Sequence, residues 1–516
     1  MTLPLYSVAD ARAIDRFAIE RLAIPGYVLM TRAATAALAR LRGRWPHARR
    51  IGVLCGPGNN GGDGYRLALL AQAAGLAVEA IALADPAGVD ACRARSDWLA
   101  AGGVVRPWEE GLPEVDLWVD ALFGIGLARG LSGAAAAVVD ALHATDRPVL
   151  ALDVPSGVDA DTGAVPGPAV RASATVEFIV GKRGLATGPA LDHVGEHWLE
   201  SLDLPAAAID SVAPHALALS HADLPGMFGS DLACQSPTST RSSSAVDACI
   251  HLPSRSRDSH KHRFGRVLCV GGDTGMAGAI ALCAQAALRT GAGVVSVATR
   301  AGHVGPLLAL QPELMVRGIE DGADFMSMAK AADLIAIGPG LGRGEWGRAL
   351  WRAALASDRP LVIDADGLTL LAEHRHAVGD AVLTPHPGEA ARLLACEPAA
   401  IQRDRFTAAA AIAEHYRATV VLKGAGSVVA TPGARPRLIA AGNPGMAVAG
   451  MGDVLAGVIA ALRGQGLAAF AAASAGALLH ACAGDAAGRD GQRGLLPSDL
   501  LPWLRRLVNP IARSVP

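Results

Sequence analysis

Residues 442–458 read GNPGMAVAGMGDVLAGV, and this stretch decides how the C-terminal half of the chain folds. It holds five glycines, one proline and a single charged residue, Asp453, and an apolar run typical of a helix start follows at once. In a structural interpretation, Asp453 caps the helix and the glycines only turn the chain. In a chemical interpretation, the glycine amides and the helix N-terminus bind an anion, and the carboxylate reacts beside it. Alone, the stretch favours the cap, so the choice depends on the remaining motifs.

Length and composition indicate a multidomain α/β protein. The chain has 516 residues, which is too long for one hydrophobic core. Hydrophobic residues make up 51% and charged residues 18%, as expected for closely packed α/β layers. The formal net charge of −2 gives no electrostatic case for nucleic acid or an anionic membrane, so we expect neither as a partner.

Targeting signals and cysteine usage indicate a cytoplasmic location. The N-terminus MTLPLYSVADARAIDRF has acidic residues and lacks the apolar core of a secretory signal. The longest weakly polar stretch is rich in alanine and falls short of a membrane-spanning helix. The eight cysteines are scattered without a C-x-x-C pair, which favours buried free thiols over disulfides or a zinc site.

Short apolar runs that end in glycine, aspartate or another polar residue recur in two parts of the chain. Such runs, separated by helix-length segments, predict parallel sheets covered on both faces, with ligands at the carboxyl ends of the strands. We therefore expect an N-terminal domain over 1–213, a serine-rich linker over 214–260 and a C-terminal domain over 261–510. The runs are RIGVLCG (50–56), DLWVDALFG (116–124), PVLALDVPSG (148–157), TVEFIVGK (175–182), GRVLCVGG (265–272), GVVSVAT (293–299), DLIAIGPG (333–340), PLVIDADG (360–367), AVLTPHPG (381–388) and TVVLKGAG (419–426).

The first glycine-rich loop, in IGVLCGPGNNGGDGYRLALLA (51–71), lies between a predicted strand and a predicted helix. It is neither G-x-G-x-x-G nor a P-loop, and a tight turn explains it about as well as a ligand site does. Asn59, Asn60 and Asp63 add polar groups that a plain turn does not need. Two further segments place polar residues at strand ends, DALFGIGLARG (120–130) and LDVPSGVDADTG (152–163).

The segments GNNGGDG, VDALFGIG, DVPSGVDADTG and TVEFIVGKRGLATGP together resemble the NAD(P)H-hydrate epimerase family, which has a Rossmann-like fold. The resemblance implies a K⁺ ion held by Asn60, Asp120 and Ser156, and Asp153 as the acid or base that interconverts the two C6 epimers. Lys182 lies in a motif segment, with a surface charge as the equal alternative, and Thr31 stands where the family has an acid. The substrate contacts implied are Asn59, Asn60, Gly61, Gly62, Asp63, Gly124, Ile125, Gly126, Leu127, Ala128, Arg129, Gly130 and Asp153.

The C-terminal motifs have similar double interpretations. VVLKGAGSVVA (420–430) is a glycine hairpin between two strands, or it places Lys423 against nucleotide phosphates. LTPHPGEAARL (383–393) presents His386 between two prolines ahead of a helix. Asp364 and Asp366 flank one alanine, and we expect them to be strand-end ligands rather than a catalytic pair.

GPGLG, DAD, TPHPGE, KGAG, NPGMAVAGMGD and SHKHRFGRVLCVGGD together resemble the ADP-dependent NAD(P)H-hydrate dehydratases, which have a ribokinase-like fold. The resemblance implies that Asp453 takes the proton from the hydroxyl group that is phosphorylated, beside an anion hole at Gly450–Gly452. Gly367, Thr369 and His262 depart from the family pattern. The substrate contacts implied are Ala279, Gly342, His386 and Asp453; those to AMP are Lys423, Gly424, Ala425, Gly426, Ser427 and Gly452.

Both motif sets in this order are characteristic of bifunctional enzymes that repair hydrated nicotinamide nucleotides. The resemblance implies NADHX, NADPHX and ADP as small-molecule partners, Mg²⁺ and K⁺ as cofactors, and a homo-oligomer. A kinase that releases a phosphorylated vitamin precursor or sugar is one alternative, which the epimerase motifs disfavour. A nucleotide-binding regulatory protein is the other, which the retained Asp453 disfavours.

Overall fold

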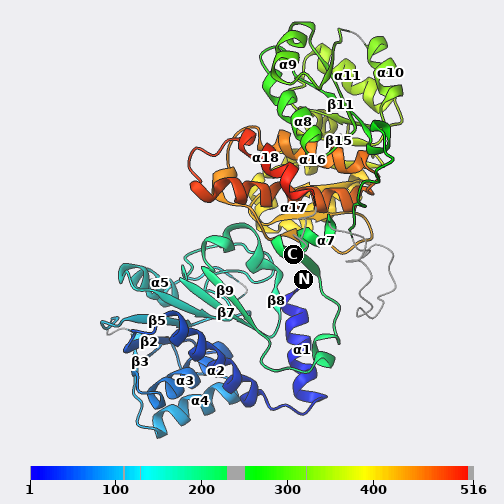
Figure 1. The fold of residues 1–516 in the computed structure, drawn as a ribbon. Helices are drawn as coiled ribbons and strands as arrows, with labels where there is room; N and C mark the ends of the chain where they lie inside the picture. Colours follow the sequence, from blue (N-terminus) through cyan, green and yellow to red (C-terminus); the bar gives the residue numbers. More distant parts are fainter. Residues whose placement is uncertain (1, 109–110, 128, 229–249, 321, 510–516) are drawn as a thin grey trace, which may run out of the picture. The chain divides into compact units, whose positions relative to one another are not determined.

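The computed structural model describes residues 2–108, 111–127, 129–228, 250–320 and 322–509. Within these ranges the chain forms two compact units, Pro4–Ala216 and Leu217 onward, the second of which also includes residues 2 and 3. Each unit is built on a largely parallel sheet (Figure 1). The predicted α/β class is therefore confirmed.

The N-terminal unit has one parallel sheet with the strand order β4-β3-β2-β5-β6-β7-β9. The order reverses between β2 and β5, which places a topological switch point at the carboxyl ends of these two strands. The strands are β2 (Arg50–Cys55), β3 (Ala77–Ala82), β4 (Val105–Pro107), β5 (Leu117–Ala121), β6 (Val149–Leu152), β7 (Ala174–Phe178) and β9 (Glu196–Glu200), and β1 (Leu3–Tyr6) pairs with β8 (Gly181–Lys182).

Helices cover both faces of this sheet and give it two separate cores. In β2, Ile51 and Val53 face the core shared with α2 and α3, whereas Leu54 faces a core that contains Trp118 and α5. This alternation explains why the strands read as continuous apolar runs. Figure 1 shows α2, α3 and α4 on one side of the sheet and α5 on the other. The helices are α1 (Val8–Glu20), α2 (Gly26–Arg44), α3 (Asn59–Ala73), α4 (Val89–Ala100), α5 (Ala134–Ala144) and α6 (Ala206–Ile209).

The C-terminal unit has a larger sheet, in which β13-β12-β11-β14-β15-β16-β17-β18-β19-β10 are neighbours. The strands β17, β18 and β19 form an antiparallel meander, and the other neighbouring pairs in this run are parallel. The strands are β10 (Ala216–Leu219), β11 (Arg266–Val270), β12 (Val294–Thr299), β13 (Met315–Gly318), β14 (Leu334–Ile337), β15 (Leu361–Ile363), β16 (Ala381–Leu383), β17 (Thr419–Leu422), β18 (Ser427–Ala430) and β19 (Arg437–Ile439).

One face of the larger sheet packs on a core formed with α8, α16 and α17. At Gly457, α16 lies so close to α8 that there is no room for a side chain. A Cβ there would lie 2.1 Å from the carbonyl oxygen of Cys283. This close approach seats the start of α16 over the carboxyl ends of the strands. The helices are α7 (Leu224–Met227), α8 (Ala277–Arg289), α9 (Val304–Leu310), α10 (Gly322–Ala331), α11 (Glu345–Leu355), α12 (Ala365–His374), α13 (Pro387–Leu394), α14 (Pro398–Arg403), α15 (Arg405–Tyr416), α16 (Met451–Gly464), α17 (Ala469–Ala487) and α18 (Pro497–Leu507).

The segment predicted as a linker (214–260) is partly ordered structure. Its first part forms β10, which pairs with β19, and α7, and Leu219, Leu224 and Phe228 enter the C-terminal core. Residues 230–248, which carry the serine-rich stretch, lie outside the described residues. The folded C-terminal unit thus includes residues that the sequence assigns to the linker.

Six cysteines in the described ranges are free, and Cys55, Cys269, Cys283 and Cys482 are buried. Among the described residues, no helix combines the length and apolar character needed to cross a membrane.

Candidate active sites

A cavity of about 480 Å³ opens at the switch point of the N-terminal sheet. The first turn of α3, with Asn59 and Asn60, and the loop after β5, with Gly124, form two of its walls. This is the position at which doubly wound sheets bind their ligands. The other residues of the lining that matter here come from α1 and from the ends of β6 and β8, namely Arg12, Asp15, Asp153 and Lys182.

Asp153 and Lys182 form a buried ion pair in this cavity. Lys182 Nζ lies 2.7 Å from Asp153 Oδ1 and donates a second hydrogen bond to the carbonyl oxygen of Phe178. The lysine side chain is only 2% exposed, so the alternative of a surface charge is wrong. Asp153 has a φ of +62°, a left-handed conformation that costs energy in a residue other than glycine. The backbone turns sharply here and presents the carboxylate to the cavity.

Further carboxyl groups give the cavity an acidic character. Asp15, Asp63 and Asp90 line it together with Asp153. Burial, reinforced by the charge of Asp153, raises the pKa of Asp63 well above its usual range and raises that of Asp15. These groups therefore hold protons at higher pH than free carboxyl groups do.

Asn60 lines the cavity, and Ser156 lies behind its wall, because Ser156 Oγ accepts a hydrogen bond from the amide of Phe123, which also lines the cavity. Asp120 Oδ1 accepts a hydrogen bond of 2.7 Å from Ser156 Oγ, and Asp120 Oδ2 accepts one of 2.8 Å from the Ser156 amide. Burial raises the pKa of Asp120 to about 6. Both polar atoms of the Asn60 amide are buried without a partner among the described residues. An unpaired amide oxygen near a buried carboxylate is a donor set that fits a hard monovalent cation.

The structure brings together most, but not all, of the substrate contacts implied for this half. Those that line the cavity are Asn59, Asn60, Asp63, Gly124, Ile125, Gly126 and Asp153. Gly61 and Gly62 instead pack the first turn of α3, where a Cβ would collide with Gly56 or with Met30 and Ala91. Leu127, Arg129 and Gly130 are outside the cavity lining, and Ala128 lies outside the described residues.

Two features of α1 and α2 extend the sequence-based description. Asp15 and Arg12 of α1 line the cavity, although nothing in the repeated strand motifs pointed to that helix. The Thr31 hydroxyl donates to the Tyr27 carbonyl oxygen within α2, at 2.8 Å, and Thr31 is outside the lining. The Thr31 side chain therefore does not reach this cavity.

In the C-terminal unit, a charged cluster forms where several strands and α16 converge. Lys423 Nζ, after β17, lies 2.7 Å from Asp364 Oδ1, after β15, and 3.7 Å from Glu389 Oε2 in α13. Thr384 Oγ1 donates to Asp364 at 2.8 Å. Burial alone would lower the pKa of Lys423, but Asp364 and Glu389 more than offset this and hold it above its ordinary value. The lysine is thus firmly cationic.

Asp453 lies in the first turn of α16, beside this cluster. A Cβ at the preceding residue, Gly452, would lie 3.0 Å from Lys423 Nζ and 3.2 Å from Asp364 Oδ2. Burial and the charge of Asp364 raise the pKa of Asp453 to about 7, while Lys423 opposes the shift. A carboxylate with a pKa near neutrality at an open helix N-terminus suits a general base next to an anion site. Gly450, with a φ of +94°, begins the helix without a side-chain cap.

His386 is the N-cap of α13. Its Nδ1 accepts hydrogen bonds from the amides of Gly388 and Glu389, at 3.0 and 3.4 Å. Burial, with Lys423 and Arg392 nearby, lowers the pKa of His386. With Nδ1 as acceptor, the neutral ring carries its hydrogen on Nε2, which lies 3.5 Å from Glu389 Oε1 at the partly exposed edge of the cluster.

The other predicted residues of this half surround the same cluster. Ser427 Oγ closes the KGAG hairpin by accepting from the Gly424 amide at 3.2 Å and donating to the Gly424 carbonyl at 3.0 Å. The Gly342 amide donates to Asp366 Oδ2 at 2.9 Å, which ties the GPGLG loop to the turn that holds Asp364. A Cβ at Gly340 would lie 3.3 Å from the Cβ of Ala279. Ala425 and Gly426 complete the hairpin between β17 and β18.

Sequence reasoning did not include three side chains of this site. Glu389 is visible in TPHPGE, yet only its contact with Lys423 shows why it matters. Arg405 is fully buried beneath the KGAG hairpin and donates to the carbonyl oxygens of Leu422 and Lys423, both at 3.2 Å. Asp273, after β11, packs against Gly342, whose Cβ would lie 2.6 Å from its Oδ2. No local pattern marks Arg405, since it begins an ordinary helix.

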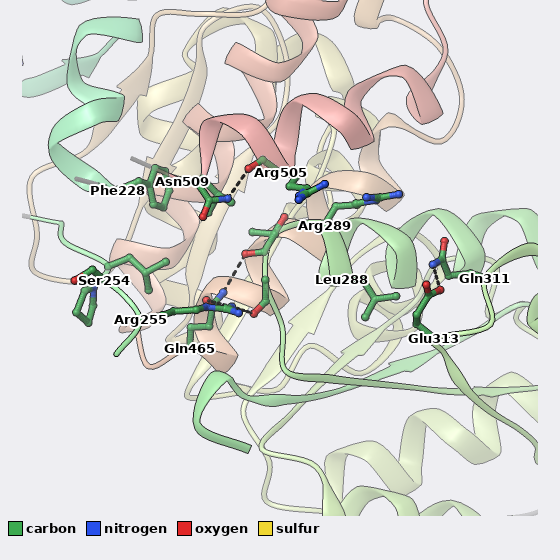
Figure 2. Close-up of a pocket in the computed structure, with 15 residues that line it drawn as sticks. Phe228, Ser254, Arg255, Leu288, Arg289, Gln311, Glu313, Gln465, Arg505 and Asn509 are labelled. Carbon is green, nitrogen blue, oxygen red and sulfur yellow. Dashed lines mark hydrogen bonds between the residues drawn. The ribbon is translucent and has the colours of Figure 1, made fainter. Parts of the chain in front are cut away.

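A second cavity, of about 590 Å³, lies elsewhere in the C-terminal unit (Figure 2). Figure 2 shows Arg289 and Arg505, which lie in the last turns of α8 and α18, close to each other. Helix C-termini present carbonyl oxygens, so these arginines complement the helix dipoles. None of the predicted site residues lines this cavity.

Comparison with known proteins covers both units. A family model described as NAD(P)H-hydrate dehydratase matches residues 267–506, and one described as YjeF-related protein N-terminus matches residues 26–184. The chain is 41% identical, over 98% of its length and 99% of the relative's, to the bifunctional NAD(P)H-hydrate repair enzyme Nnr of Coxiella burnetii. It is 42% identical to the enzyme of the same name from Escherichia coli, over 97% of this chain and 93% of that one.

Among solved structures, the ADP/ATP-dependent NAD(P)H-hydrate dehydratase of Bacillus subtilis, co-crystallised with ATP/Mg²⁺, is similar to part of the chain. The match has 27% sequence identity and a TM-score of 0.45, and it covers 50% of this chain and 93% of that chain.

Proposed function

The chain belongs to the family of bifunctional NAD(P)H-hydrate repair enzymes, and we propose that its two units divide the two reactions between them. The N-terminal unit epimerises R- and S-NAD(P)HX. The C-terminal unit dehydrates S-NAD(P)HX to NAD(P)H and uses ADP as the phosphoryl donor, with release of AMP and phosphate. The main support for the dehydratase reaction in the C-terminal unit is Asp453, a carboxylate with a pKa of about 7 at a helix N-terminus that has no side-chain cap.

In the epimerase, Asp153 is the acid or base at C6, and Lys182 is the positioning residue that holds it. The ion pair of 2.7 Å fixes one carboxylate oxygen and leaves the other free for the substrate. Because Asp63 and Asp15 hold protons readily, they suit hydrogen-bond donation to the hydrated ring or the ribose.

The donor set of Asn60, Asp120 and Ser156 supports K⁺ as a cofactor of this half. The ion would satisfy the buried Asn60 amide oxygen and offset the buried charge of Asp120. When bound, K⁺ supplies a fixed positive charge near the substrate. Asn60 also lines the cavity, so the same side chain connects the cation site with the nucleotide.

In the dehydratase, Asp453 removes the proton from the C6 hydroxyl as its oxygen attacks the β-phosphorus of ADP, and AMP leaves. The amides around Gly450–Gly452 and the dipole of α16 stabilise the transferring phosphoryl group. The C6–O bond then breaks as the ring nitrogen donates its electron pair, so that phosphate leaves, and a proton is lost to restore the dihydropyridine. The positive charge of Lys423 offsets the repulsion between the carboxylates of the cluster and the phosphates of ADP. The KGAG hairpin contacts the AMP portion of the nucleotide.

Mg²⁺ fits this site mainly through the nucleotide. Among the described residues, no group of three or more His, Cys, Asp or Glu side chains is arranged to hold a metal ion. Mg²⁺ keeps several waters and is commonly bound by one or two carboxylates together with substrate phosphates, and Glu389 and Asp364 are available for that. When bound, it neutralises charge on the phosphoryl oxygens.

The test is direct, because NADH absorbs where its hydrate does not. Purified protein with hydrated NADH, ADP and Mg²⁺ should restore the absorbance band of the reduced nicotinamide. Phosphate release that needs a sugar or a vitamin alcohol instead of the hydrate would establish the kinase alternative. Binding of nucleotide without turnover would establish the regulatory one.

Location and assembly are separate proposals. Buried free cysteines suit a reducing compartment, which supports a cytoplasmic location. A homo-oligomer is implied by the resemblance, and light scattering of the purified protein measures it.

A further inference from the structure

The loop that leads into α16 is held in place by a different helix, α17. Asp485, near the end of α17, accepts a hydrogen bond of 2.8 Å from the Gly442 amide through Oδ2. Its other oxygen, Oδ1, accepts one of 2.9 Å from Asn443 Nδ2. Asn443 Oδ1 in turn accepts from the Gly445 amide at 3.0 Å. One carboxylate and one amide side chain thus hold the first residues of the loop Gly442–Gly450 at Gly442, Asn443 and Gly445.

The surface of α17 under this loop is made of small residues. A Cβ at Gly484 would lie 2.3 Å from Met446 Sδ, and one at Gly488 would lie 3.1 Å from Asn443 Nδ2. Side chains at these positions would push the loop away from the helix. The glycines on either side of Asp485 therefore permit the contact that Asp485 makes.

The same helix also contacts the far end of the loop. His480, one turn before Asp485, is buried and forms a hydrogen bond with the backbone of Met451, the first residue of α16. α17 therefore holds the loop at both ends, at Gly442–Asn443 and at Met451. Gly450 lies between these two contacts. Gly452 and Asp453 follow directly after the second contact, in the first turn of α16.

Asp485 has a third partner outside the loop. His221 Nε2 lies 3.1 Å from Asp485 Oδ2, and His221 belongs to a short 3-10 helix (His221–Asp223) that follows β10. This contact helps to keep the partly buried carboxylate in one orientation, with both of its oxygens aimed at the loop.

We propose that Asp485 is a positioning residue of the dehydratase reaction. Through its hydrogen bonds with Gly442 and Asn443 it fixes the loop that leads into α16. The loop in turn fixes the position of the phosphoryl-binding amides relative to the Asp453 carboxylate. The inference rests on the function proposed above for the C-terminal unit. A carboxylate suits this role because the loop offers two donors side by side, and an amide at 485 could accept only one of these bonds.

The experiment uses the full-length protein and the variant Asp485→Asn. We expect kcat of the dehydratase to fall roughly tenfold to a hundredfold, because small misplacements at a reacting centre are costly. The KM for the hydrate should stay within about twofold, as for loss of an interaction used mainly in the transition state. Epimerase activity, measured in the same preparation, should stay unchanged and shows that the chain is folded.

A swapped double variant separates positioning from a general loss of structure. In Asn443→Asp with Asp485→Asn, residue 485 can donate to residue 443 and accept from Gly442, while residue 443 still accepts from Gly445. We expect this variant to recover most of the lost kcat. A matched control is Asp333→Asn, because Asp333 also accepts from a backbone amide (Arg266, 2.8 Å) and a side chain, at the opposite edge of the sheet.

The outcomes are distinct. If the wild-type protein lacks ADP-dependent dehydratase activity, the proposed function itself fails. If the wild type is active and Asp485→Asn keeps its kcat, or if the swap recovers nothing, the positioning role is wrong. If Asp333→Asn loses as much kcat as Asp485→Asn, the loss comes from a general destabilisation of loops and not from positioning of Asp453. This outcome would also overturn the proposal.

Discussion

Lys182 Nζ lies 2.7 Å from Asp153 Oδ1, and this pair places one of the four lysines of the chain in the lining of the N-terminal cavity. The pair joins the end of β6 to β8, so its geometry is set by two strands rather than by a loop. A charge buried to this extent needs its partner, because an unpaired buried ion is strongly destabilising. Structure and catalysis therefore depend on the same contact.

Replacing Lys182 by methionine should slow epimerisation roughly tenfold to a hundredfold, because Asp153 loses the group that orients it. The measurement is the rate at which a single purified epimer equilibrates, followed by chromatography. Dehydration of the S epimer should continue at the wild-type rate. Lys330→Met, at an exposed lysine of α10, is the matched control and should leave both rates unchanged. Wild-type epimerisation in Lys182→Met would show that the pair is only structural.

Asp453→Asn should lower kcat of the dehydratase by on the order of 10²- to 10⁴-fold, since the general base is lost. The pKa of about 7 also sets the pH dependence of the wild type. The base works when ionised, so kcat should rise with pH and level off above about 7. A profile that is already flat at pH 5 would contradict the assignment of Asp453.

Lys423→Met should move this rising limb to higher pH. Lys423 lowers the pKa of Asp453, and without it Asp364 and Glu389 would raise that pKa further. Activity at neutral pH should fall, and part of it should return in alkaline buffer. A shift toward lower pH would show that the ammonium group does not act on the base.

K⁺ should stabilise the N-terminal unit in a way that depends on pH. The pKa of Asp120 is raised to about 6, so in the absence of a cation its ionisation above pH 6 opposes folding. K⁺ binds the ionised form and offsets that cost, and protons compete with it. We expect KCl to raise Tm relative to choline chloride in alkaline buffer, and the difference to vanish as the pH falls through about 6. Asp120→Asn should show a small difference at every pH.

The boundary of the C-terminal unit can be tested with two truncated chains. A chain that begins at residue 261 lacks β10 and the buried side chains Leu219, Leu224, Met227, Phe228 and Ile250. Burial of five such side chains is worth about 10 kcal/mol, which is comparable to the whole stability of a domain. We expect this chain to aggregate, whereas one that begins at residue 214 should fold and retain dehydratase activity. Equal melting temperatures would contradict this.

The strand ends could be predicted from the sequence because each is a local feature. Apolar runs that stop at Gly56, Asp153 or Lys423 predicted strands, and parallel pairing then gathered their ends at one edge of each sheet. The K⁺ donor set and the role of Asp453 as a base come only from the resemblance of whole motifs, and both stay predictions. Alone, the stretch around Asp453 favoured a helix cap over a catalytic residue.

The remaining features depend on contacts between distant segments. Whether Lys182 is buried depends on Asp153 and Phe178, and nothing in GKRGLATGP tells a buried lysine from an exposed one. Asp485 acts on a loop more than forty residues earlier, since its partners are Gly442 and Asn443. The strand ALAL at Ala216–Leu219 has only four residues, so its short sequence does not define it, and its pairing with β19 is visible only in the structure.

The pairing of β10 with β19 also has a consequence for how the chain is made. Leu217 pairs with Arg437, so the two strands emerge from the ribosome 220 positions apart. At ordinary rates of synthesis that interval lasts roughly 10 to 45 s. During this time the N-terminal unit can complete its own sheet, while the edge of β10 that pairs with β19 and the apolar side chains after β10 wait for the C-terminal core. A nascent chain of this length therefore exposes apolar side chains that are later buried, and we expect chaperone binding to be strongest between the synthesis of residues 230 and 440.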